Sequence, residues 1–105
     1  DRTYVLEIQN GTTVQGLAKN TSALLQSIGY DVLTTTNADS NDYEKTIIID
    51  HINNPQVASS LGDFIMCDNI IVEEVQSEDA SLDANLLVDF TIILGEDFDG
   101  RYVRD

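Results

Sequence analysis

The chain has 105 residues, of which 42% are hydrophobic, and its 19 acidic and 5 basic residues give a formal net charge of −14. This length suits one domain with a modest core, and the periodic apolar blocks exclude a disordered acidic tail. The acidic surface excludes nucleic acid as an expected partner, because phosphate binding depends on Lys and Arg. No apolar run approaches the ~18 residues that a membrane helix needs, so we expect no direct membrane insertion of this chain.

The chain opens with an expected strand followed by a helix. Residues 3–9 alternate between apolar and polar side chains, as half-buried strands do. Asn10-Gly11 breaks this strand. Thr12 and Gln15 fit a capping box, which predicts a helix over residues 13–28.

Two further strands are expected after this helix. Gly29 suits the left-handed position that follows a helix. Residues 30–35 are rich in β-branched and aromatic types and predict the second strand, whereas residues 37–44 form a polar loop. The apolar run within residues 45–50 predicts a third strand in the interior of the sheet.

The second half of the chain predicts one helix and two strands. Asn54-Pro55 is a strong helix start, with Asn as the cap and Pro in the first turn. Strands are expected over residues 69–75 and 87–94, on either side of an acidic loop at residues 76–85. Residues 99–105 are expected to be a loose tail.

The element order is therefore β-α-β-β-α-β-β, which predicts an α+β two-layer sandwich. Two amphipathic helices need a sheet to bury their apolar stripes, so both are expected on one face of a mixed sheet of four or five strands. The alternating polar positions indicate that the other face is at least partly open to water. One domain is expected over residues 1–105, with its core at about residues 3–98.

The sequence lacks the residues of a recognisable catalytic or metal centre. The single histidine, His51, and the single cysteine, Cys67, cannot form a standard zinc set, and no nucleophile elbow occurs. We therefore expect no catalytic residues, no metal and no cofactor. Calcium stays open, because residues 39–42 and 97–100 are rich in oxygen ligands, although neither run continues to the bidentate Glu of a calcium loop.

Four blocks together resemble a known family. They are residues 8–12, residues 16–18, residues 37–40 with 42–46, and residues 92–98, in this order and spacing. The similarity spans residues 4–98 and is to the C-terminal accessory domain of LytR/CpsA/Psr cell-envelope proteins, the LytR C-terminal domain family. The resemblance implies an extracytoplasmic location, in the periplasm or cell envelope, with a membrane anchor upstream of residue 1. The family's upstream catalytic domain has no counterpart in this chain, so its transferase activity is not expected here.

The leading hypothesis is a non-catalytic envelope module that binds peptidoglycan or a related wall glycan. Amides, hydroxyls and one aromatic ring suit sugar hydroxyls and sugar faces. The expected ligand-binding residues are Asn10, Gly11, Thr12, Asp39, Asp42 and Tyr43. The alternative is a protein-interaction module that docks another envelope protein through a sheet edge or the acidic surface, with a homodimer as a special case. A hydrolase or transferase fragment is a third, less favoured hypothesis.

Overall fold

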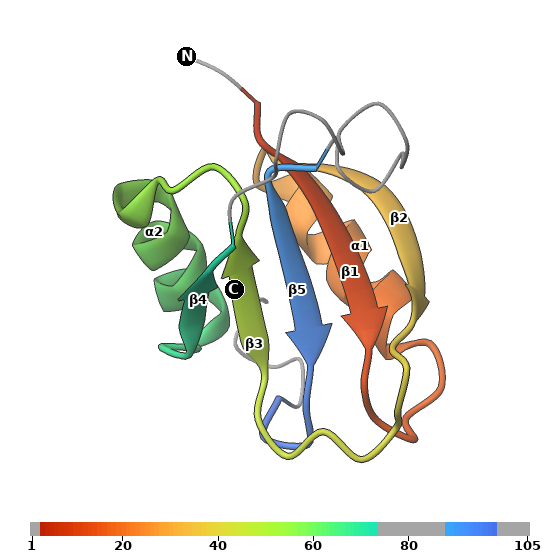
Figure 1. Ribbon diagram of the computed structural model, residues 1–105. Helices are drawn as coiled ribbons and strands as arrows, with labels where there is room; N and C mark the ends of the chain where they lie inside the picture. The colour runs from red at the N-terminus through yellow and green to blue at the C-terminus, as the bar shows by residue number, and fades with distance from the viewer. Residues whose placement is uncertain (1–2, 74–87, 99–105) are drawn as a thin grey trace, which may run out of the picture.

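A computed structural model describes residues 3–73 and 88–98. These residues form one five-stranded sheet and two helices (Figure 1). In chain order the elements are β1 (Val5–Asn10), α1 (Leu17–Ser27), β2 (Asp31–Asn37), β3 (Ile47–Asp50), α2 (Pro55–Ile65), β4 (Ile70–Val72) and β5 (Phe90–Leu94).

The sheet is mixed, and its strand order is β2-β1-β5-β3-β4. Strand β1 runs parallel to both β2 and β5, β3 runs antiparallel to β5, and β4 runs parallel to β3. Parallel neighbours need a crossover connection. Helix α1 provides it between β1 and β2, and α2 provides it between β3 and β4 (Figure 1).

Both helices pack on the same face of the sheet and share one core. The core residues come from alternating strand positions and from one stripe of each helix. They are Leu6, Ile8, Leu17, Ala18, Leu25, Ile48, Ala58, Leu61, Ile65, Phe90, Ile92, Leu94 and Phe98. The α+β two-layer architecture expected from the sequence is therefore confirmed, and the expected interior position of β3 is also confirmed.

The second face of the sheet is less open than its polar residues suggest. Gln9 and Ile49 are partly exposed, which agrees with a partly open face. Glu7 and Thr91, however, lie on this face with only 6% and 4% of their surfaces exposed. The Thr91 hydroxyl donates a hydrogen bond to Glu7 Oε1 at 3.0 Å, so these two polar groups satisfy each other.

The start of α1 differs from the expectation. The helix begins at Leu17 rather than at residue 13, and its N-cap is Gly16, which has φ 78° and makes no side-chain capping hydrogen bond. The capping box of Thr12 and Gln15 is therefore wrong. The Thr12 hydroxyl instead accepts a hydrogen bond from the Val14 N–H at 3.1 Å, which stabilises a turn before the helix.

The other helix boundaries agree with the expectations. The Asn54 side chain caps α2 by accepting a hydrogen bond from the Val57 N–H at 3.2 Å, and Pro55 is the first helical residue. Gly29 has φ 109°, a left-handed conformation that favours glycine after the end of α1.

The expected final strands are longer than those of the structure. Strand β4 occupies three residues of the expected 69–75, and β5 begins at Phe90 rather than at residue 87. The expected acidic loop at residues 76–85 and the tail at 99–105 lie outside the described residues. Neither α1 nor α2 has the length and apolar character of a membrane-spanning helix.

Candidate functional site

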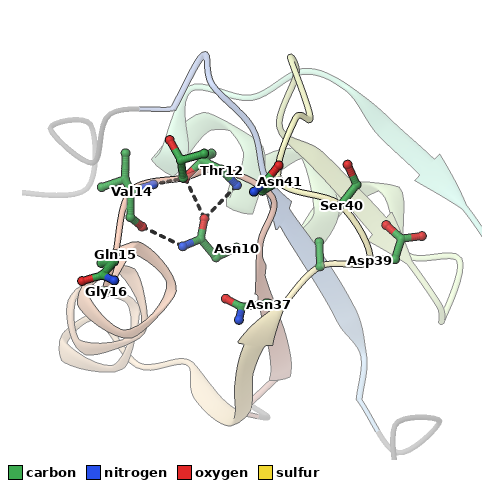
Figure 2. A pocket seen from close by; sticks show the side chains of 11 residues that line it. Asn10, Thr12, Val14, Gln15, Gly16, Asn37, Asp39, Ser40 and Asn41 are labelled. Carbon is green, nitrogen blue, oxygen red and sulfur yellow. Dashed lines mark hydrogen bonds between the residues drawn. The ribbon is translucent and has the colours of Figure 1, made fainter.

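A polar pocket of about 900 Å³ lies where β1 and β2 end, beside the start of α1 (Figure 2). Its floor is the end of β1, and its two walls are the turn before α1 and the loop that follows β2. The described residues that line it are Asn10, Thr12, Thr13, Val14, Gln15, Gly16, Asn37, Ala38, Asp39, Ser40 and Asn41. The carboxyl ends of parallel strands are a frequent position for ligand sites, because the connecting loops gather there.

Asn10 holds the first wall of the pocket in place. Its Oδ1 accepts hydrogen bonds from the Thr12 N–H at 2.9 Å and from the Thr12 hydroxyl at 2.7 Å. Its Nδ2 donates to the Val14 carbonyl oxygen at 2.8 Å (Figure 2). Asn10 is buried, and these three bonds use its Oδ1 and one of its two Nδ2–H donors. The side chain therefore helps to fix the shape of the pocket that it lines.

Gly11 lets the second wall approach the sheet closely. Its N–H donates to the Leu94 carbonyl at 2.9 Å, and its carbonyl accepts from the Tyr43 N–H at 3.0 Å. A Cβ at this position would lie 2.7 Å from both Leu94 O and Tyr43 Cδ1. Only glycine fits between this backbone and this ring, so Gly11 joins the loop of residues 38–43 to the sheet.

Asp39, Asp42 and Tyr43 form the outer part of the second wall. The Tyr43 hydroxyl donates to Asp39 Oδ1 at 2.8 Å, and this hydrogen bond raises the pKa of the exposed Tyr43 phenol. Asp42 accepts a hydrogen bond from the Ser40 hydroxyl. Of these three expected site residues, Asp39 lines the pocket, whereas Asp42 and Tyr43 support the loop from outside it.

The structure thus brings all six expected residues into one region and gives them different positions. Asn10, Thr12 and Asp39 line the pocket, whereas Gly11, Asp42 and Tyr43 do not. The pocket also includes residues that the sequence reasoning did not single out: Thr13, Gln15, Asn37, Ser40 and Asn41. Their positions in the sequence could have identified them, because they are polar residues in the same two expected loops.

The described lining offers hydrogen bonds rather than charge. It contains amides, hydroxyls and one carboxylate, and none of its described residues is Lys, Arg or His. This set suits a neutral ligand rich in hydroxyl and amide groups, and it disfavours an anion. Within residues 3–73 and 88–98, no group of three or more His, Cys, Asp or Glu side chains is placed to hold a metal ion.

His51 and Cys67 lie far apart and away from this pocket. His51 follows β3, where its Nε2 lies 2.9 Å from Thr91 Oγ1 and its Nδ1 lies 3.1 Å from the Glu73 carbonyl oxygen. Cys67 Sγ donates to the carbonyl oxygen of Thr46, the residue that precedes β3, at 3.3 Å. Burial raises the pKa of the Cys67 thiol, which disfavours the nucleophilic thiolate.

The fold resembles that of a solved bacterial protein. The soluble domain of a conserved hypothetical secreted protein from Mycobacterium marinum superposes with a TM-score of 0.68 at 17% sequence identity. The match covers 93% of this chain and 62% of that domain, so this chain spans less than two thirds of its length. A comparison with curated proteins finds no match.

A family model described as the LytR cell envelope-related transcriptional attenuator matches residues 3–98, nearly the whole chain. This match includes every described strand and helix, together with both walls of the polar pocket. The chain therefore belongs to the LytR C-terminal family, whose members are accessory domains of cell-envelope proteins.

Proposed function

We propose that this envelope domain is a non-catalytic, extracytoplasmic module that holds the uncharged sugar backbone of a wall glycan, such as peptidoglycan, in the polar pocket. The observation that supports this most directly is the lining of a cavity of about 900 Å³ by amides and hydroxyls at the ends of two parallel strands. A cavity of this size accommodates a small oligosaccharide, since small-molecule sites span ~300–1,000 Å³.

The residues divide into those that shape the pocket and those that bind the glycan. In this proposal the walls are shaped by the hydrogen bonds of Asn10, Thr12 and Tyr43. Gly11 contributes because its missing Cβ leaves room for the loop. The exposed side chains of Thr13, Gln15, Asn37 and Asn41 remain for sugar hydroxyls and acetamido groups. In this proposal the Asp39 carboxylate accepts from a sugar hydroxyl while it also accepts from Tyr43.

Co-sedimentation of the purified chain with peptidoglycan sacculi at low salt tests this function. We expect retention of the chain, and we expect the double variant Gln15→Ala/Asn41→Ala to bind roughly 10-fold more weakly, because each lost hydrogen bond contributes ~0.5–1.5 kcal/mol. Both side chains are exposed, so neither substitution should unfold the domain.

Gln56→Ala provides the matched control, since Gln56 is an exposed glutamine on α2, away from the pocket. It should bind sacculi like the unchanged chain. Absence of retention for the unchanged chain, or equal weakening by the control, would contradict the proposal.

A further inference from the structure

A second hollow of about 380 Å³ lies at the opposite end of the sheet from the polar pocket. We call it the helix groove; it runs between the end of α1, the residues before β1 and one side of α2. Its described lining residues are Tyr4, Ile28, Gly29, Tyr30, Val57, Ser60 and Phe64. The polar pocket follows β1 in the chain, whereas Tyr4 precedes β1, so the two sites are separated by the length of that strand.

One wall of the groove is formed by residues of α2 that lie beside its buried stripe. Ala58, Leu61 and Ile65 face the core and are buried. Val57, Ser60 and Phe64 recur at helical spacing and line the groove, and Val57 also packs against the core. Phe64 is 37% exposed, and Ile28 on the opposite side is 41% exposed. Large apolar side chains that border one hollow are typical of interaction sites.

The floor of the groove is preformed by contacts within the chain. The Tyr4 ring packs edge-to-face on the buried Phe90 ring, with centroids 6.0 Å apart and an interplanar angle of 62°. The Tyr4 carbonyl accepts a hydrogen bond from the Asp31 N–H at 3.0 Å, and the Tyr30 N–H donates to the Leu25 carbonyl at 3.2 Å. A preformed groove lowers the ordering cost of binding.

The described charged residues that directly neighbour the groove lining in sequence are acidic. Asp31 follows Tyr30, and Asp63 precedes Phe64 and lies three residues after Ser60 on α2; both carboxylates are exposed. The two lysines of the described residues lie elsewhere. Lys19 is nine residues before Ile28 on α1, about 13 Å along the helix, and Lys45 precedes β3 at the opposite end of the sheet. Aromatic ring faces also attract cations, which adds to the preference for a basic partner.

We propose that the helix groove binds a basic segment of a partner protein, with an aromatic or aliphatic anchor in the groove and Lys or Arg residues beside Asp31 and Asp63. The volume accommodates one or two large side chains rather than a whole helix face. A second copy of this chain fits poorly, because a net charge of −14 on each copy opposes association. This inference is independent of the proposed glycan site.

Titration of the ¹⁵N-labelled chain with the peptide Lys-Lys-Leu-Phe-Lys-Lys, capped at both ends and followed by NMR, tests the inference. We expect amide shifts confined to Tyr4 and residues 28–31 and 57–64, with binding that weakens as salt is added. A peptide with Glu in place of every Lys should bind at least roughly 10-fold more weakly, and one with Gly in place of Leu and Phe should lose the shifts at Val57 and Phe64.

Two double variants of equal net charge distinguish binding of the basic peptide at the helix groove from its non-specific attraction to the negatively charged protein. Asp31→Asn/Asp63→Asn should weaken the basic peptide roughly 10-fold, whereas Glu44→Gln/Asp68→Asn, which changes exposed acids away from the groove, should leave its affinity within about 2-fold. Equal weakening by both double variants would overturn the proposal. Shifts outside the groove, no shifts at all, or occupation of the groove by a second copy as protein concentration rises would also overturn it.

Discussion

Asn10 is the residue that connects the end of β1 to the shape of the polar pocket. Its amide makes three hydrogen bonds to the turn that becomes the first wall. Its type and position were readable from the sequence, where Asn-Gly after an alternating strand indicates a turn. Its structural role was not readable, because the three hydrogen bonds to the turn form only once the chain is folded.

Replacing Asn10 with alanine should therefore lower the stability of the domain. Asn10→Ala leaves the buried Thr12 N–H and the Val14 carbonyl without their partner, at a cost of about 2–4 kcal/mol in the free energy of unfolding. Urea denaturation followed by circular dichroism measures this loss. Asn20→Ala, on the exposed side of α1, is the control and should be neutral or slightly stabilising because alanine favours helix. Equal stability of Asn10→Ala and the unchanged chain would rule out this role.

The two helices show where local sequence decides an element boundary and where it does not. Both the cap and the first turn of α2 are local features, so Asn54-Pro55 predicted its start correctly. The first helix was expected four residues too early. The residues from Thr13 to Gly16 are compatible with helix, but Asn10 and Thr12 bind their backbone into a turn instead. That competition depends on where β1 ends.

The cap of α2 should make a measurable local contribution. Asn54→Ala removes the acceptor of the Val57 N–H and should lower stability by about 1 kcal/mol. Thermal unfolding followed by circular dichroism checks this, and Asn69→Ala is the matched control, because within residues 3–73 and 88–98 the exposed Asn69 engages its backbone carbonyl and makes no side-chain hydrogen bond. A larger loss for Asn69→Ala than for Asn54→Ala would argue against the cap.

At the scale of the whole molecule, β5 holds the two halves of the sheet together. It comes from the far end of the chain and lies between β1 and β3, parallel to one and antiparallel to the other (Figure 1). On the second face, Thr91 of β5 links Glu7 of β1 to His51 after β3. The Glu7 carboxylate also accepts from the Gln9 amide at 3.3 Å. Hydrogen bonds of side chains thus cross three strands.

Removing the Thr91 hydroxyl should weaken this connection without changing the volume of the side chain much. Thr91→Val deprives Glu7 Oε1 and His51 Nε2 of a partner and should cost about 1–3 kcal/mol in the free energy of unfolding at pH 7. Thr36→Val, on the exposed edge strand β2, is the control, where a β-branched replacement should be neutral. A stability for Thr91→Val equal to that of the control, measured by urea denaturation, would contradict a structural role for the network.

The sequence by itself determined the element types, the fold class, the position of β3 inside the sheet and the two loops that carry the site. Alternation, helical spacing, caps and turn residues act over a few neighbouring residues, so one sequence contains them. Tertiary structure decided the strand order, the burial of Glu7 and which site residues face the pocket. Backbone pairing between strands is nearly independent of side-chain identity, so only the packing of both helices against the sheet selects the arrangement that places Asn10 beside Asn37.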